Sequence, residues 1–385
     1  MNQVPFNKPF LTGKETFYIE DAVKTGKISG NGKYTQKCQH WFEETYGFQK
    51  VLLTTSCTDA LEMAAILANI KEGDEVLVPS FTFVSTAIAF VRQGAKIVFA
   101  DSYPDNPNMD VSKLEALITS KTKAIVPVHY AGVACDMDPI MALAEQYNLL
   151  VIEDAAQAID SYYTGKDGVK RALGSIGHLA AFSFHETKNI ISGEGGMLTV
   201  NDARFVYRAE IIWEKGTNRA EFFRGEVNKY GWVDTGSSFL PSEIIAAFLW
   251  AQIENLEAIQ NKRKTLWQAY YAAFSALNRQ DLTLPKLPSY ATNNGHLFYL
   301  VLDSIEQRTA LIEKLKENGF HAVFHYLSLH SSDYYKDKHD GRSLPHSDRF
   351  SDCLVRLPLF YELDIKIIEK IVSCIGNFMK EGYDN

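Results

Sequence analysis

A lysine and an aspartate stand at the ends of two apolar stretches of this sequence. Lys188 follows the β-prone stretch LAAFSFH (179–185), and Asp154 is the last residue of LLVIED (149–154). A lysine in a site of low dielectric constant has a lowered pKa and can form a Schiff base with a carbonyl compound. A carboxylate in such a position can cap a helix, bind a metal or pair with a cofactor. The pair therefore suits covalent chemistry on a carbonyl group.

Hydroxyl groups and an aromatic ring follow other apolar stretches. TTSCTDALE (54–62) brings hydroxyls and free backbone N–H groups to the start of a helix, which is either a plain N-cap or a seat for an anion. Pyridoxal phosphate requires a lysine, an acidic partner for its pyridine nitrogen, a phosphate seat and a stacking aromatic ring. Lys188 and Asp154 are candidates for the first two. The candidates for the phosphate seat and the ring are Ser56, Cys57, Thr58, Ser183 and Phe83.

Two other kinds of site fit these residues less well. A dinucleotide-binding site needs GxGxxG between a first strand and its helix, whereas Gly193, Gly195 and Gly196 precede a predicted strand. No cluster of His, Cys and Asp with metal-ligand spacing surrounds Asp154, so no metal is expected.

Strands must carry the candidate side chains to a common edge. Short apolar stretches alternate with helical ones from about residue 50 to 202, which is typical of a mostly parallel sheet covered by helices on both faces. Ligands bind beyond the carboxyl ends of the strands in such sheets. A long helical region begins near Pro241, and we expect it to bend or break where it joins two domains.

The length of 385 residues also predicts two domains. We place a large cofactor-binding α/β domain at residues 1–255 and a small α/β domain at residues 256–385. In the small domain the pattern predicts strands at 296–303 and 321–326, a loop to about Pro345 and two final helices.

Charge and composition limit the partners. The formal net charge of −8 argues against a nucleic-acid partner, which would require a basic face. The five cysteines are scattered and lack a CxxC motif, so we expect reduced thiols. The first residues, MNQVPFNKPF, are polar, and no apolar run approaches the length of a membrane span. We therefore expect a cytoplasmic protein with no membrane partner.

Longer stretches of the sequence resemble one enzyme family. The motifs SCTDALEMA, GDEVLVPSFTFVSTA, VIEDAAQA, GHLAAFSFHETKN and LPLFYEL occur through nearly the whole chain in the order of the family. They resemble the DegT/DnrJ/EryC1/StrS group of sugar-nucleotide aminotransferases, which are fold-type-I pyridoxal-phosphate enzymes. The resemblance implies that fold, that cofactor, which becomes pyridoxamine phosphate during turnover, and a homodimer with active sites shared between subunits.

The resemblance also implies a role for each matching residue of the cofactor site. Lys188 would form the Schiff base and move the proton, Asp154 would pair with the pyridine nitrogen, and Gln157 would meet the ring hydroxyl. Phe83 would stack on the ring. Ser238, in GSSFLPSE, stands where many members have an asparagine that reaches the phosphate in the partner subunit's site. The residues implied to hold the phosphate within one chain are Ser56, Cys57, Thr58 and Ser183.

The reaction implied by the resemblance is transfer of an amino group to a nucleotide sugar. L-glutamate would be the donor, and TDP-4-keto-6-deoxy-D-glucose would be aminated at C4 to give TDP-4-amino-4,6-dideoxy-D-galactose. The residue types leave open the equatorial product, TDP-4-amino-4,6-dideoxy-D-glucose, and a 3-amino sugar. Each cation among the candidates for binding the nucleotide sugar has the alternative of an exposed surface residue, and each histidine has the alternative of a structural side chain. These candidates are Tyr34, Lys215, Arg219, Arg224, Lys229, His325, Tyr326 and His330.

Two other functions fit the same fold. Sugar 3-dehydratases resemble this family but carry histidine at the position of Lys188, so the lysine argues against them. A regulator that kept the fold without its activity should have lost Lys188 or Asp154, and both are present.

Overall fold

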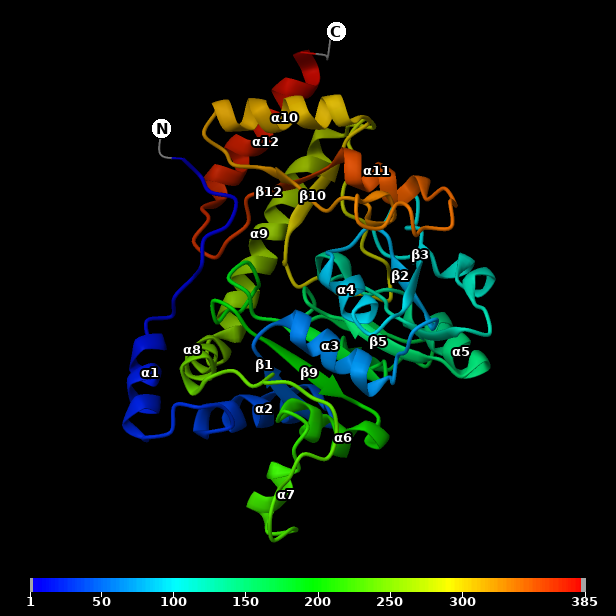
Figure 1. Ribbon diagram of the computed structural model, residues 1–385. Helices are drawn as coiled ribbons and strands as arrows, with labels where there is room; N and C mark the ends of the chain where they lie inside the picture. The colour runs from blue at the N-terminus through cyan, green and yellow to red at the C-terminus, as the bar shows by residue number, and fades with distance from the viewer. Residues whose placement is uncertain (1–2, 382–385) are drawn as a thin grey trace.

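The computed structural model describes residues 3–381 and is built around a seven-stranded sheet (Figure 1). One strand, β9, runs antiparallel to both of its neighbours, and the other pairings are parallel. This confirms the predicted mostly parallel α/β sheet. In spatial order the strands are β1 (Lys50–Thr54), β9 (Gly196–Val200), β8 (Leu179–Ser183), β5 (Leu150–Asp154), β4 (Thr122–Ile125), β2 (Glu75–Pro79) and β3 (Lys96–Ala100).

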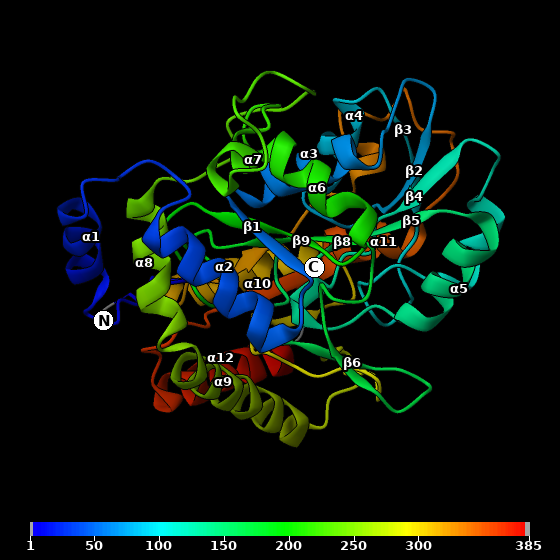
Figure 2. The same ribbon diagram turned by 90° about the horizontal axis from the view of Figure 1, so that it is seen from below.

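Both faces of this sheet are apolar because successive side chains of each strand enter opposite cores. In β1, Leu52 packs into one core, while Val51 and Leu53 pack into the other. Helices cover both faces, as Figure 2 shows from below. The Leu52 side holds α3 (Cys57–Leu67), α4 (Ser85–Val91) and α6 (Ala203–Trp213), and the Val51 side holds α2 (Lys33–Tyr46), α5 (Met137–Tyr147) and α8 (Glu243–Ile253), with α1 (Glu15–Lys24) packed on α8.

The C-terminal part has its own three-stranded sheet and its own core. Leu300 of β10 and Val355 of β12 lie in that core with Tyr270 of α9, and α9 runs up to the small sheet from beside α8 (Figure 1). The strands, in the order β10, β12, β11, are Phe298–Val301, Leu354–Leu357 and Val323–Phe324. The helices are α9 (Leu256–Leu277), α10 (Ile305–Glu317), α11 (Pro345–Cys353) and α12 (Ile365–Glu381).

Several elements differ from the sequence prediction. The predicted strand 124–130 ends at Ile125, and Pro127, which has no N–H to donate, follows closely. The strand β12 between the two final helices was not predicted. The long helical region breaks at Glu254–Asn255, so the predicted domain boundary at 255, which stays a prediction, falls between α8 and α9. The remaining short elements are the hairpin β6 (Tyr162–Thr164) and β7 (Lys170–Ala172), helix α7 (Arg219–Arg224), and 3-10 turns at Val111–Lys113, Glu115–Leu117, Tyr130–Gly132 and Leu329–Ser331.

No helix in the described range 3–381 is long and apolar enough to span a membrane.

A buried carboxylate holds the start of α2, and we expect its replacement to destabilise the fold. Glu243 is 1% exposed and accepts backbone hydrogen bonds from Gly32 (2.9 Å), Tyr34 (2.7 Å) and Thr35 (3.1 Å), besides one from the Thr35 hydroxyl. Glu243→Gln puts an NH2 group against these donors and should lower the free energy of unfolding by about 2–4 kcal/mol. Urea unfolding measures it, with the exposed Glu257→Gln as control. Equal stability of the two variants would contradict the capping role.

Candidate active site

A cavity of about 810 Å³ opens at the carboxyl ends of the central strands, between the large sheet and the small one. Its walls come from the loops after β1, β2, β5 and β8, and from β11 and β12 of the small sheet. This is the edge at which parallel sheets bind ligands. The cavity brings together ten of the residues predicted from sequence: Ser56, Cys57, Thr58, Phe83, Asp154, Gln157, Ser183, Lys188, His325 and Tyr326.

Lys188 lies in the loop that joins β8 to β9. The loop folds back on itself through the hydrogen bonds Phe184 N–H to Gly195 O (2.8 Å) and Glu186 N–H to Gly193 O (2.9 Å). Gly193 takes a φ of +81°, a left-handed conformation that favours glycine. The Lys188 amine has no hydrogen bond or ion pair with the residues of range 3–381.

The surroundings of Lys188 change its acidity. Burial lowers the pKa of the amine below the usual lysine range, while the nearby Asp154 carboxylate acts in the opposite direction. The positive charge of Arg356 lowers the same pKa further. A free amine with a lowered pKa is more nucleophilic at neutral pH than an exposed lysine, which is the property that carbonyl chemistry requires.

Asp154, at the end of β5, is 5% exposed and has a fixed carboxylate. Its Oδ2 accepts a hydrogen bond from the Thr86 hydroxyl (2.7 Å), and its Oδ1 accepts one from the Ala156 N–H (3.1 Å). The Thr82 hydroxyl lies 2.9 Å from that of Thr86, so a chain of hydroxyls leads to the carboxylate. Each carboxylate oxygen retains lone-pair capacity for a further donor.

The start of α3 fits the predicted phosphate seat. Ser56 is the N-cap, and its hydroxyl accepts from the Asp59 N–H at 3.1 Å, so the plain capping role exists. The backbone N–H groups of the first turn are those that α-helices leave without partners. Gly196 packs against this turn so closely that a Cβ there would lie 2.5 Å from the Cys57 nitrogen. Thr58 and Ser85 share a hydroxyl contact of 2.8 Å at the cavity wall.

Gln157 and two aromatic residues line the opposite wall. The Gln157 amide accepts from the Ala131 N–H (2.6 Å) and donates to the Tyr326 hydroxyl (2.9 Å), which leaves one amide hydrogen for a ligand. Tyr326 has a φ of +35°, a strained conformation that a functional site can hold. His325 stacks on it and shares a hydrogen bond of 2.7 Å with the Tyr130 hydroxyl.

The other predicted residues lie away from this cavity. Tyr34 is 2% exposed, and its hydroxyl donates to Asp21 at 2.7 Å. His330 is also buried and shares a hydrogen bond of 2.7 Å with the Ser80 hydroxyl. The contact of His330 matches its structural alternative, and neither side chain lines the cavity, so the predicted sugar contacts of Tyr34 and His330 stay predictions.

The remaining predicted residues belong to residues 215–238, a segment that projects from the body and carries α7; we call it the α7 arm (Figures 1 and 2). Its predicted cations and hydroxyl are exposed, and none lines the cavity of its own chain. These residues are Lys215, Arg219, Arg224, Lys229 and Ser238.

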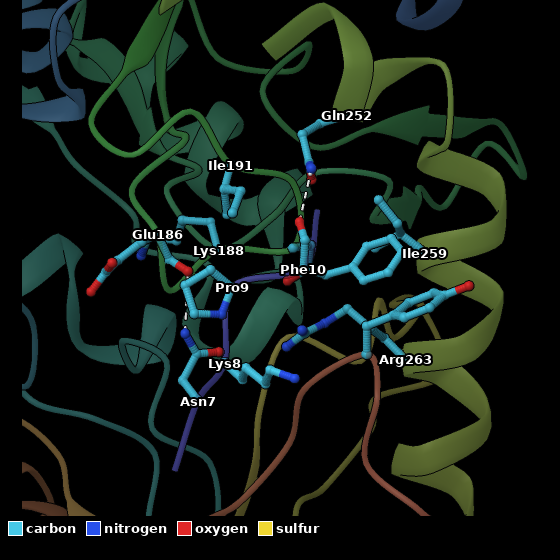
Figure 3. Close-up of a pocket in the computed structure, with 12 residues that line it drawn as sticks. Asn7, Lys8, Pro9, Phe10, Glu186, Lys188, Ile191, Gln252, Ile259 and Arg263 are labelled. Atoms are coloured by element: carbon cyan, nitrogen blue, oxygen red, sulfur yellow. Dashed lines mark hydrogen bonds between the residues drawn. The ribbon is translucent and has the colours of Figure 1, made fainter. Parts of the chain in front are cut away.

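The N-terminal segment also closes the site, which the sequence did not predict. Figure 3 shows Asn7 to Phe10 lying between the Lys188 loop and α9, beside a small pocket. The Asn7 amide donates to the Glu186 carbonyl (3.2 Å), and the Gln252 amide donates to the Phe10 carbonyl (2.9 Å). Other cavity residues missed from the sequence are Arg263, His296 and Arg356.

Pyridoxal phosphate fits the chemistry of these side chains. The unpartnered Lys188 amine, a fixed carboxylate at Asp154 and a helix start with free N–H groups match the aldehyde, ring nitrogen and phosphate of that cofactor. Phe83 lines the cavity and is 55% exposed, so one face of its ring is open to stack on the cofactor ring. No group of three or more His, Cys, Asp or Glu among residues 3–381 is arranged to hold a metal ion.

Thr86 should matter because it orients Asp154. Thr86→Val removes the 2.7 Å hydrogen bond without changing the size of the side chain much, so we expect activity to fall by about 10-fold or more. Thr86→Ser keeps a hydroxyl and should restore most of it. The measurements are kcat/KM and the affinity for pyridoxal phosphate. Wild-type values in Thr86→Val would contradict the orienting role.

Comparisons with known proteins identify the family of this chain. The model of the DegT/DnrJ/EryC1/StrS aminotransferase family matches residues 10–376. A DegT DnrJ EryC1 StrS aminotransferase from Brucella abortus is 29% identical, with 95% of each chain covered and a TM-score of 0.85. DesV from S. venezuelae, solved with a ketimine intermediate, is 26% identical over 100% of both chains, with a TM-score of 0.89.

A third structure shows the same fold at lower identity. Spr1654 from Streptococcus pneumoniae, described as a candidate sugar aminotransferase and solved in its PLP form, is 24% identical, with 98% of this chain and 99% of that chain covered and a TM-score of 0.88. The match of the family model over nearly the whole chain shows that the protein belongs to the DegT/DnrJ/EryC1/StrS aminotransferase family, whose cofactor is pyridoxal phosphate.

Proposed function

We propose that this enzyme transfers the amino group of L-glutamate to C4 of TDP-4-keto-6-deoxy-D-glucose. The product would be TDP-4-amino-4,6-dideoxy-D-galactose, a precursor for surface polysaccharide. The observation that carries the aminotransferase chemistry is the free amine of Lys188 in one cavity with the fixed carboxylate of Asp154. The choice of sugar is supported by PSFTFVSTA, IVPVHYAGVACDMD, FSFHETKN and EKGTNRAEFFRG, which resemble the TDP-4-amino-4,6-dideoxygalactose transaminase of enterobacterial common-antigen synthesis.

Each functional residue of the cavity has a separate role in such a transfer. When bound, pyridoxal phosphate supplies a ring that accepts the electrons of the donor's Cα–H bond. The Asp154 carboxylate keeps the ring nitrogen protonated, and the first turn of α3 binds the phosphate. The Lys188 Nζ would move the proton from the donor's Cα to C4′ of the cofactor and, in the second half of the cycle, the proton from C4′ to C4 of the sugar. Gln157 donates its remaining amide hydrogen to the ring hydroxyl.

The nucleotide part of the substrate requires cations, and the α7 arm carries them. Because Lys215, Arg219 and Lys229 do not reach the cavity of their own chain, we propose that they and Ser238 reach the partner's cavity in a homodimer. The arm also exposes large aromatic side chains that a partner would bury: Trp232 is 84% exposed and Phe223 is 68% exposed. We expect sedimentation to give a mass of two chains, and an active monomer would contradict this arrangement.

The substrate assignment is tested by the product. Enzyme with pyridoxal phosphate, L-glutamate and TDP-4-keto-6-deoxy-D-glucose should yield a TDP-amino sugar, identified by NMR. A small H3–H4 coupling indicates the axial amine of the galacto product, and a large one indicates the equatorial gluco alternative. Formation of no amino sugar, or of a 3-amino sugar, would refute the proposed substrate.

A further inference from the structure

Arg356 projects from the middle strand of the small sheet into the active-site cavity. It lies on β12, paired with Tyr299 of β10 and Val323 of β11, so its backbone position is fixed from both sides. Its guanidinium donates one hydrogen bond, from Nη2 to the Phe324 carbonyl at 3.1 Å. Arginine has five N–H donors, so most of its capacity is unused.

The guanidinium lacks a negative partner. No carboxylate among residues 3–381 forms an ion pair with it, and its Nε is buried without any hydrogen-bond acceptor. A buried N–H group without an acceptor is unfavourable, and native proteins seldom retain one without a ligand or water. Burial also lowers the pKa of Arg356.

Arg263, the buried arginine of the same cavity, contrasts with the half-buried Arg356. Arg263 donates to the carbonyls of Gly295 (3.0 Å) and His296 (2.6 Å), with a longer contact to Leu359 (3.4 Å). These acceptors occupy its fork, so Arg263 serves the packing of α9 against the small sheet. Arg356 has the Phe324 carbonyl as its one acceptor among residues 3–381, so its Nε and Nη1 lack partners there.

The N-terminal segment holds Arg356 in position. The Phe6 ring lies 4.7 Å from the guanidinium carbon, at cation–π distance. The segment is fixed at Phe6 itself by the Leu359 N–H to Phe6 carbonyl bond (3.3 Å) and at the next residue by the Asn7 bond to Glu186 that Figure 3 shows. A preorganised guanidinium loses little freedom when a ligand binds.

Arg356 lines the same cavity as the reacting amine of Lys188, and its positive charge lowers the pKa of that amine. Two carboxylates line the cavity, Asp154 and Glu194, and neither forms an ion pair with Arg356; the oxygens of Asp154 accept from Thr86 and Ala156. Among residues 3–381, no paired carboxylate balances the charge of Arg356, and an anionic substrate group would balance it. The predicted phosphate seat belongs to the start of α3 beside the large sheet, whereas Arg356 stands on β12 of the small sheet, so we assign a different anion to Arg356.

We propose that Arg356 binds the α-carboxylate of the amino-acid donor. This assignment deepens the proposed function and rests on it. The planar fork of arginine matches a carboxylate through two parallel hydrogen bonds. The α-carboxylate is attached to the carbon that loses its proton to Lys188, so its binding beside Lys188 orients the Cα–H bond. The keto-sugar has no carboxylate, and Arg356 therefore acts chiefly in the donor half of the cycle.

The test compares the two half-reactions in Arg356→Gln and Arg356→Lys. We expect kcat/KM for the L-glutamate half-reaction to fall by about 100-fold or more in Arg356→Gln and less in Arg356→Lys. The reverse half-reaction with the TDP-amino sugar should change by less than about 10-fold. Arg308→Gln is the matched control. Arg308 lies on α10, which packs with the small sheet, and its guanidinium carbon is 5.4 Å from the centre of the Phe324 ring, but it does not line the cavity.

Two further measurements keep the result unambiguous. Glutarate, a dicarboxylate without an amine, should bind the loaded wild type in calorimetry and lose that binding in Arg356→Gln, while affinity for pyridoxal phosphate stays unchanged. In Arg356→Gln, the rate of the slow single turnover with L-alanine should fall by the same factor as the rate with L-glutamate. A loss confined to L-glutamate would assign Arg356 to the side-chain carboxylate and overturn the proposal, as would equal loss in both half-reactions.

Failure of this inference differs from failure of the proposed function. If the wild type fails to bind pyridoxal phosphate or to convert L-glutamate, the proposed function fails. If the wild type converts L-glutamate and Arg356→Gln does so equally well, only the assignment of Arg356 is wrong.

Discussion

Lys188→Ala is expected to abolish transamination, with at least a 10⁴-fold loss of kcat, because the variant loses both the covalent attachment of the cofactor and the base that moves the proton. The visible absorption band of lysine-bound pyridoxal phosphate should disappear as well. Circular dichroism should remain unchanged, since the Lys188 amine makes no hydrogen bond with residues 3–381 that the fold would lose. Lys166→Ala, on an exposed turn, is the control.

The lowered pKa of Lys188 adds a pH dependence to this prediction. Only the neutral amine attacks an aldehyde, and burial moves the loss of its proton to a pH below 10.5. The rate at which the apoenzyme combines with pyridoxal phosphate should therefore rise with pH and level off before an exposed lysine would. A rate that still climbs at pH 10.5, or a retained visible band in Lys188→Ala, would contradict the role of this lysine.

Asp154→Asn should reduce kcat by about 10³-fold while the protein still binds the cofactor. The amide cannot carry the negative charge that keeps the ring nitrogen protonated, so the ring accepts electrons poorly. The side chain keeps its size, and an amide oxygen can still accept from Thr86 or Ala156. Half-reaction rates measured by stopped flow, together with the visible band, separate slow chemistry from weak binding.

Asp160→Asn provides a control for Asp154→Asn. Asp160 accepts from Lys264 at 2.8 Å and is absent from the cavity lining, so its loss should leave the half-reactions within about 2-fold of the wild type. A wild-type rate in Asp154→Asn would show that the carboxylate does not control the ring nitrogen.

The residues that carry the chemistry could be predicted because they follow strands. Lys188, Asp154 and Phe83 stand after apolar stretches, and parallel strands bring their carboxyl ends to one edge of the sheet. That rule requires only the order and type of the elements. It does not show which side chains occupy the lone pairs and N–H groups of each functional residue.

Arg356 and Thr86 illustrate what the sequence did not reveal. The strand β12 is four residues long, and its partners β10 and β11 are remote in the sequence, so LVRL looked like part of the helices around it. Thr86 stands in a helical stretch 68 residues from Asp154, and only folding brings their side chains together. Apolar periodicity contains no information about such pairs.

The sequence could not place the residues of the α7 arm for a different reason. Spacing shows that Lys215, Arg219 and Lys229 are cations near one another, but it does not show in which chain their target lies. The α7 arm that carries them projects from the body (Figure 1), the three residues are exposed, and a homodimer would give them a site. Their part in sugar binding stays a prediction.

Borohydride trapping tests the central claim, that Lys188 carries the cofactor in this cavity, most directly. Reduction of the loaded enzyme makes the bond between lysine and cofactor permanent, and peptide mass spectrometry locates it. The account predicts a pyridoxyl group on Lys188, absent when L-glutamate has first converted the cofactor to its amine form. A pyridoxyl group on another lysine, or none on any, would contradict the account.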